Sequence, residues 1–199
     1  MAKKPISKEE EELIDQLKQD VQQAFINVAN NDQFWCRTLV RAVFSYLEAH
    51  SFVIRSVTRK LLKADAGNLE SVAKILLLAE AGYQPGGTGK LEEGPEPRTP
   101  FINQFAFTLR TYAEAGGMKD ADIARFFGDN AFNQLRKAKN VRDRLTHPKK
   151  LSDITVSHAD VLDVTSGFNW AGRFILDVEA RLRKTRKRAA RATSRKKMP

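Results

Sequence analysis

Arg142 and His147 lie five positions apart in the stretch NVRDRLTHPKK, residues 140–150, which holds one of the three histidines of the chain. A guanidinium is a permanently charged planar fork that suits a phosphate oxygen. An imidazole titrates near neutrality and can move a proton. Together the two groups could cut RNA without a metal, as a base for the 2′-hydroxyl and a cation for the pentavalent phosphorus.

The geometry of this stretch depends on where its helix ends. On an unbroken α-helix, five positions rotate two side chains by roughly 140°, so Arg142 and His147 should not meet. Pro148 follows the histidine directly and drives it out of the helical region. Asp143 precedes His147 by four positions, so that on the helix the carboxylate could orient the imidazole. The alternative is a plain helix terminus, where basic residues and a following proline are common.

The elements that must position these residues are helices. Apolar residues recur at helical spacing after Ser7 and over about 33–63, 68–83, 101–115 and 129–146, with a short helical segment at 120–127 and a last helix beginning after Ser157. The sequence SHAD at 157–160 resembles a capping box with Asp in place of Glu. The pattern predicts an all-α, single-domain bundle of about five to six helices. It divides into an N-terminal helix (1–30), a helical domain (31–182) with a Gly/Pro-rich loop at 84–100, and a basic tail (183–199).

Charge is unevenly distributed along the chain. The net charge is +10, and residues 181–199 carry ten Lys or Arg and no acidic residue, which leaves 24 basic against 24 acidic residues before them. Such a tail suits a phosphate backbone, because binding releases counterions. The alternative is a solvated extension that aids solubility.

A second set of charges follows one side of the predicted 33–63 helix. Five side chains fall within about 40° of one another at 100° per residue: Arg37, Arg41, Glu48, Arg55 and Arg59. They form either a solvated face joined by Arg–Glu pairs or an arginine track for a nucleic acid.

Several classes of protein are not expected. The three histidines are scattered and no Cys or acidic cluster has ligand spacing, so we expect neither a metal nor another cofactor. The single cysteine, Cys36, suits a buried thiol in a reducing compartment. No apolar run is long enough to cross a bilayer, and the first residues do not read as a signal peptide. The sequence therefore predicts a cytoplasmic protein without a membrane partner.

The motif resembles that of the HEPN superfamily, small all-helical domains with an Arg-x4-6-His signature in which the residue after the arginine is usually Asn, Asp or His. Here the signature reads RDRLTH, from Arg142 through Asp143 to His147. It ends a late predicted helix, a long final helix follows, and an earlier long helix carries WCRTLVRAVFSYLEAH, residues 35–50. The resemblance covers about residues 31–182.

The resemblance implies a metal-independent endoribonuclease of phage defence, a toxin–antitoxin system or RNA processing. It implies a homodimer in which two motifs flank one cleft. By this analogy Arg142 holds the phosphate, His147 is the acid/base and Asp143 orients it, while Glu48 on the long helix faces the cleft as a further catalytic residue. The alternative is a non-catalytic helical RNA-binding or dimerisation module.

The expected partners are RNA, a second copy of the chain and a regulatory protein. The residues expected to bind RNA are Arg37, Arg41, Arg144, Lys149 and Lys150. HEPN toxins silenced by a nucleotidyltransferase antitoxin usually carry a tyrosine two positions after the histidine. Lys149 stands there in this chain, so that mode of regulation is not expected.

Overall fold

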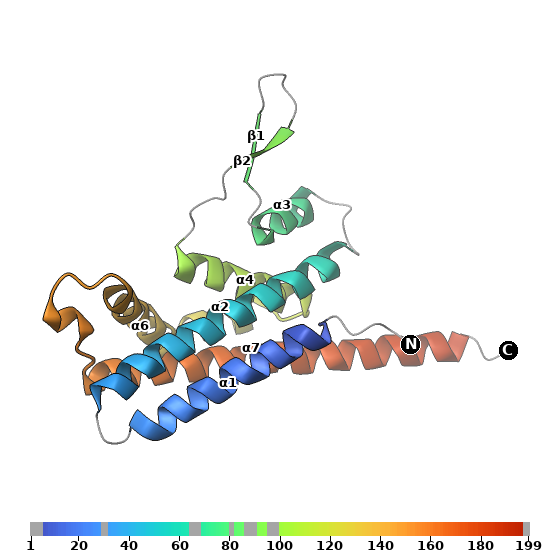
Figure 1. The fold of residues 1–199 in the computed structure, drawn as a ribbon. Helices are drawn as coiled ribbons and strands as arrows, with labels where there is room; N and C mark the ends of the chain where they lie inside the picture. Colours follow the sequence, from blue (N-terminus) through green and yellow to red (C-terminus); the bar gives the residue numbers. More distant parts are fainter. Residues whose placement is uncertain are drawn as a thin grey trace.

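The computed structural model describes residues 6–28, 32–63, 69–79, 82–85, 91–94 and 100–196, and the described residues form an all-α bundle (Figure 1). The predicted fold class is therefore confirmed. The helices are α1 (Lys8–Asn27), α2 (Gln33–Lys63), α3 (Leu69–Leu78), α4 (Phe101–Ala115), α5 (Asp120–Phe127), α6 (Asn130–Thr146) and α7 (His158–Lys196), with a 3-10 helix, η2 (Leu151–Ile154), before the last. The described residues thus hold seven α-helices where five to six were expected, because α5 is a separate helix of about two turns.

Local signals in the sequence set the helix ends. The Ser7 hydroxyl accepts the N–H of Glu10 at 3.1 Å and the Glu10 carboxylate accepts the N–H of Ser7 at 2.7 Å, a capping box that begins α1. Ser157 and Asp160 exchange the same pair of bonds at the start of α7, as SHAD predicted. After α4, Gly117 has a φ of 75°, a left-handed conformation that glycine adopts without strain.

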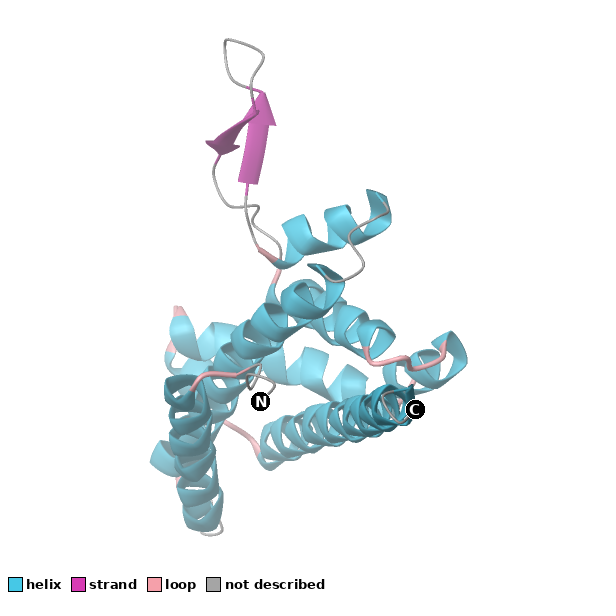
Figure 2. Ribbon diagram, turned by 90° about the vertical axis from the view of Figure 1, so that its right-hand side faces the viewer, coloured by secondary structure: helices cyan, strands magenta, loops and turns pink. Residues whose placement is uncertain are grey.

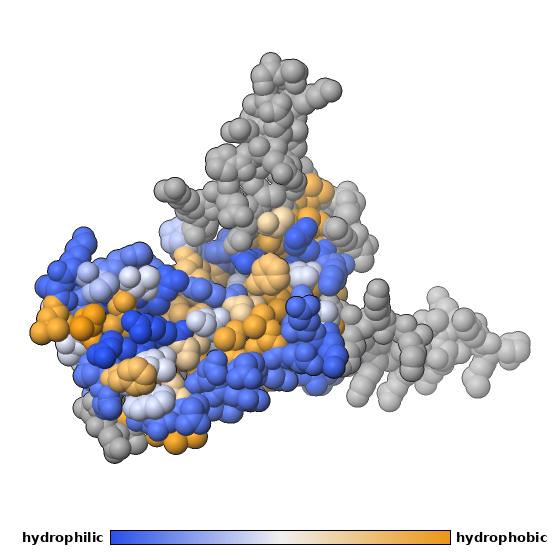
Figure 3. Space-filling view, viewed as in Figure 1, coloured by the Kyte–Doolittle hydropathy of each residue, from blue (hydrophilic) through white to orange (hydrophobic). Residues whose placement is uncertain are grey.

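The bundle is built around α2, against which α1, α3, α4, α6 and α7 all pack. In Figure 1, α1 lies in front of α2 and α7, and the C-terminal part of α7 extends beyond the other helices. Much of the outer side of α1 is hydrophilic (Figure 3), although Leu13, Phe25 and Ile26 on this helix are exposed. α6 packs chiefly along α7, so the position of the motif is set by these two helices and α2.

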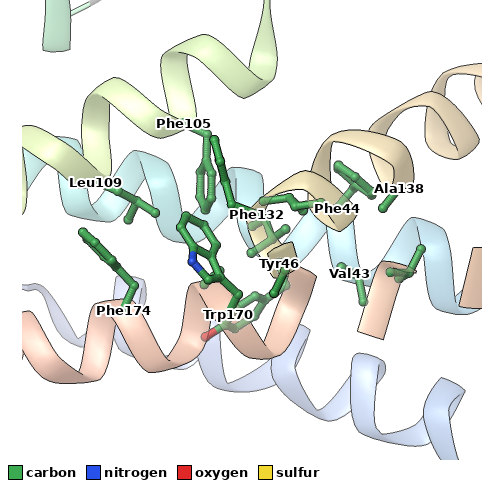
Figure 4. Close-up of a cluster of buried hydrophobic side chains, with 14 of the residues drawn as sticks. Val43, Phe44, Tyr46, Phe105, Leu109, Phe132, Ala138, Trp170 and Phe174 are labelled. Atoms are coloured by element: carbon green, nitrogen blue, oxygen red, sulfur yellow. The ribbon is translucent and has the colours of Figure 1, made fainter. Parts of the chain in front are cut away.

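An aromatic core fixes α6 against α7 (Figure 4). The fully buried Trp170 lies with its ring 4.9 Å from that of Phe132 on α6, and its indole N–H donates to the Phe126 carbonyl at 2.9 Å. The two helices approach each other closely at Gly167, where an added Cβ would lie 2.8 Å from the Cα of Leu135. Tight packing of this kind leaves α6 little freedom to shift.

The segment 84–100, expected to be a loop, contains most of a short antiparallel pair. Strands β1 (Gly82–Pro85) and β2 (Leu91–Gly94) pair with Tyr83 opposite Glu93, and they project away from the helices (Figure 2). The loop prediction is corrected here, because strands of four residues are too short to show a clear alternation. Residues 86–90 and 95–99 lie outside the described part of the chain.

The backbone of α7 continues without a break across the expected boundary between residues 182 and 183, as far as Lys196. Lys, Arg and Ala are good helix formers, and neither Gly nor Pro occurs between 173 and 198 to end the helix. Much of the predicted basic tail is therefore a helical extension of the bundle.

Candidate active site

The site lies where α6 ends. The Asp129 carboxylate caps the N-terminus by accepting the N–H of Ala131 at 2.9 Å, and the helix runs to Thr146. His147 has φ −128° and ψ 61°, outside the helical region, as the following Pro148 requires. The N–H of His147 still donates to the Asp143 carbonyl at 3.0 Å. The histidine is therefore the first residue beyond the helix, and its backbone is held in place.

Arg142 is anchored to a different helix. Its Nη2 lies 2.6 Å from Oε1 of Glu48 on α2, and its Nη1 lies 3.4 Å from Oδ1 of Asp143. The Arg142 side chain is 33% exposed and that of Glu48 is 43% exposed. The structure thus brings together three of the four predicted catalytic residues, with the guanidinium held between two carboxylates and still in contact with solvent.

Lys139 belongs to this cluster, although the sequence analysis did not select it. Its Nζ lies 2.5 Å from Oδ2 of Asp143. The spacing of four between the two residues is the usual signal for an ion pair on a helix surface, and it could have identified the lysine. Lys139 and Arg142 together place two cations around the Asp143 carboxylate, so the cluster is not dominated by its acids.

The side chain of His147 is exposed. Among the described residues, its imidazole has no hydrogen-bond partner, and the hydrogen bonds and ion pairs of the Asp143 carboxylate go to Lys139 and Arg142. The orienting role of Asp143 therefore stays a prediction, and it would require the carboxylate to exchange partners. The imidazole itself is free to reach a ligand from solvent.

Arg144 is committed to the segment that follows the motif. Its guanidinium donates to the carbonyl of Asp153 at 2.9 Å, to that of Thr155, and to Oδ2 of Asp160 at 2.7 Å. These acceptors fasten residues 147–157 between α6 and the start of α7. The predicted contact of Arg144 with RNA gains no support from this geometry, because the guanidinium is occupied within the chain.

Asp153 organises the backbone beside His147. Its carboxylate accepts the N–H groups of Lys149 at 2.9 Å and Lys150 at 3.1 Å. These interactions hold the pKa of Asp153 below its ordinary value. The largest cause is the hydrogen bond from the Lys149 N–H, and the hydrogen bond from Lys150 and the nearby cations add to it. The ammonium groups of Lys149 and Lys150 are left exposed next to the histidine, in a position to meet an anion.

Arg37 and Arg41, the other predicted RNA ligands, lie on the N-terminal part of α2. Arg37 is half-buried and donates to the Ile154 carbonyl at 3.3 Å. One turn before it, the Gln33 amide exchanges two hydrogen bonds with the backbone of Val156, at 2.8 and 2.9 Å. Both residues fix the 147–157 segment to α2. Arg41 is exposed and lines a hollow between α1 and α2.

Two hollows of the described part of the molecule lie against α1. The larger, of about 510 Å³, lies between α1, α2 and α7 and is lined mainly by apolar residues, including Phe25, Val43 and Phe168. The smaller, of about 350 Å³, is the one that Arg41 lines. Neither is lined by Arg142 or His147, and the candidate site lies at the end of α6, where the His147 side chain is exposed.

The other histidines have different surroundings. His50 on α2 shares a hydrogen bond of 2.8 Å between its Nδ1 and the Tyr46 hydroxyl, and burial lowers its pKa to about 4. His158 is exposed at the first turn of α7. Cys36 is buried, and burial raises the pKa of its thiol. Among the described residues, no group of His, Cys, Asp and Glu could hold a metal ion.

In comparisons with protein-family models, with curated proteins and with solved structures, no match to the chain is found. Within the described residues, no helix combines the length and apolar character needed to span a membrane. Fold and site together define an all-α bundle protein with an exposed cluster of Arg, Lys, Glu, Asp and His at one helix end.

Proposed function

We propose that the chain is a metal-independent endoribonuclease of the HEPN type. The observation that supports this most is the position of Arg142. It lies on α6, the helix that ends at the exposed His147, and its guanidinium is held at 2.6 Å by Glu48 of α2. A fixed cation and a free imidazole near the end of one helix are the two kinds of group that metal-independent RNA cleavage needs. Lys149 and Lys150 add positive charge where the substrate phosphate would arrive.

The reaction begins when the imidazole of His147 takes the proton of a ribose 2′-hydroxyl. The 2′-oxygen then attacks the adjacent phosphorus, so that the P–O2′ bond forms and the P–O5′ bond breaks. Arg142 stabilises the charge on the equatorial oxygens, and Glu48 positions the guanidinium. The leaving 5′-oxygen receives a proton, which in a homodimer comes from the protonated imidazolium of the second copy, leaving that imidazole neutral. The products are a 2′,3′-cyclic phosphate and a 5′-hydroxyl.

The proposal includes a homodimer that acts on RNA in the cytoplasm, in phage defence or a toxin system under a regulatory protein. The exposure of His147 favours a second copy, since an active site works best where water is excluded. A copy packed against this surface would form a cleft around the motif and exclude water from it.

The decisive experiment is a cleavage assay on total RNA in the presence of EDTA. The wild-type protein is expected to cut, and the His147→Ala and Arg142→Ala proteins are expected to lose about 10²-fold or more in rate while staying folded. His158→Ala is the matched control, because it removes an exposed histidine from the neighbouring helix. Intact RNA with the wild-type protein at high concentration would refute the proposal, as would equal cleavage by the His147 and His158 variants.

A second function, RNA binding without catalysis, is favoured by one observation. α7 extends as a helix to Lys196 through a sequence with no acidic residue after Glu179. Such a basic extension can bind a phosphate backbone. Deleting residues 186–199 keeps the anchors of α7, since Arg181 pairs with Asp122 and Asp177 and Leu182 packs against the core. This function predicts that the affinity for RNA falls steeply as the salt concentration rises. Deleting residues 186–199 should make this salt dependence shallower, and the bound RNA should not be cleaved.

A further inference from the structure

The outward side of α6 carries a line of polar residues that leads towards His147 at the end of the helix. Asn133, Arg136, Lys137 and Asn140 are all exposed. At 100° per residue they occupy about 100° of the helix circumference, opposite the buried residues Phe132, Leu135, Ala138 and Val141. On the same rotation, the backbone of residue 147 falls on this side, whereas Arg142 falls on the opposite side, where it pairs with Glu48 of α2. We refer to the four exposed residues as the α6 stripe.

The stripe has the charge and the donors of a site for a polyanion. Arg136 and Lys137 provide two cations between two amides, and the stripe contains no acidic residue. The acid closest in sequence on α6, Asp143, is already paired with Lys139 and Arg142. Among the described residues, Lys137 takes part in no ion pair, in contrast to Lys139 two positions later. Its charge is therefore available to an external partner.

Part of the stripe is fixed before any ligand arrives. The guanidinium of Arg136 lies over the ring of Phe132, 4.7 Å from its centroid. Phe132 is itself buried against Trp170, so the cation rests on a rigid support. An arginine held in this way loses less side-chain entropy when it binds a phosphate.

The composition of the stripe indicates nucleic acid and not protein as its partner. The centre of a protein interface is rich in aromatic and apolar side chains and poor in charge, and the α6 stripe has no exposed apolar member. Cations suit phosphates, while the amides of the two asparagines can reach base edges and ribose hydroxyls. From residue 133 to residue 147 a helix rises about 21 Å, enough for several nucleotides.

We propose that the α6 stripe is a binding track for single-stranded RNA and that it leads the strand towards His147. The inference rests on the proposed function for the identity of the substrate, but it concerns binding and not cleavage. It assigns to Lys137 and Arg136 contacts with phosphates on one side of the scissile bond. It assigns to Asn133 and Asn140 contacts with bases or riboses.

The test measures binding in the absence of cleavage. In the His147→Ala protein, a 5′-fluorescein single-stranded 15-mer RNA is titrated by fluorescence anisotropy at several salt concentrations. Lys137→Gln is expected to weaken binding by roughly 3- to 10-fold and to reduce the slope of log K against log salt by about 0.7, the value of one phosphate contact on a single strand. Asn133→Ala is expected to weaken binding without changing the slope.

The matched control is Lys18→Gln, which removes the same charge from an exposed position on α1. If Lys137→Gln and Lys18→Gln weaken binding equally, or neither does, the stripe proposal is overturned. Cleavage by the His147-containing protein is scored separately in EDTA. If binding depends on Lys137 but no RNA is cleaved, the nuclease proposal is refuted and the stripe proposal is supported. If RNA is cleaved but Lys137→Gln does not affect binding, the stripe proposal is refuted and the nuclease proposal is supported.

Discussion

The guanidinium of Arg142 on α6 and the carboxylate of Glu48 on α2 form an ion pair of 2.6 Å between residues 94 positions apart in the sequence. The pair joins two helices at the point where the proposed chemistry occurs. Because both side chains are partly exposed, the pair contributes at most about 1 kcal/mol to stability. Its greater effect is to fix the direction of the guanidinium.

Replacing Glu48 should therefore reduce cleavage more than stability. In Glu48→Ala, Arg142 loses its partner on α2, and we expect kcat for RNA cleavage to fall about tenfold or more, because a small loss of alignment is costly in a preorganised site. We expect KM to change little and the free energy of unfolding to fall by less than about 1 kcal/mol. Steady-state kinetics and urea denaturation measure the two effects. Faster cleavage by Glu48→Ala would show instead that the carboxylate competes with the phosphate for the arginine.

The close approach of α7 to α6 gives a prediction about stability alone. Gly167→Ala would place a methyl group 2.8 Å from the Cα and Cβ of Leu135, so the helices must separate, and we expect a loss of about 1–3 kcal/mol. Gly172→Ala is the matched control on the same helix, since an added Cβ there meets nothing within 4 Å. That change should stabilise by about 0.5–1 kcal/mol. Thermal or urea denaturation of both variants measures these changes in stability. An equal change for Gly167→Ala and Gly172→Ala would contradict the close packing of α7 against α6 at Gly167.

The sequence predicted the long helices because their apolar residues repeat over many turns. The predicted helix over about 33–63 matches α2, which runs from Gln33 to Lys63, and the predicted SHAD cap begins α7. The sequence could not predict contacts between distant segments, such as Gln33 with Val156 or Arg142 with Glu48, since a 3.6-residue period contains no information about which surface residues meet. It placed Arg142, Asp143 and Glu48 in one site through a family resemblance. Lys139 was missed although its spacing from Asp143 was visible.

His50 should make stability depend on pH in the acid range. Its pKa is lowered to about 4 by burial in the native protein, against about 6.5 for an unperturbed histidine. Between these values the unfolded chain binds a proton that the native state does not, so the free energy of unfolding falls as pH falls from about 6.5 to 4. The contribution present at neutral pH is at most about 3 kcal/mol.

The measurement compares the wild-type protein with His50→Gln by urea denaturation at pH 7 and pH 4.5. Other groups also titrate in this range, so the informative quantity is the difference between the two proteins. The variant should lose less stability on acidification, while the exposed His158→Gln should follow the wild type. Parallel curves for the His50 variant and the wild type would mean that His50 becomes protonated within the folded protein without a penalty.

Pro148 should control the conformation of His147, the proposed acid/base. In Pro148→Ala nothing excludes residue 147 from the helical region, so α6 can extend past it and change the direction in which the imidazole points. We expect the Cα chemical shift of His147 to move toward the helical value and RNA cleavage to fall about tenfold or more. Stability should change by less than about 1 kcal/mol because the site is exposed. Pro100→Ala, at the N-terminus of α4, controls for the loss of a proline elsewhere. Unchanged cleavage in Pro148→Ala would show that the non-helical conformation of His147 has no part in the reaction.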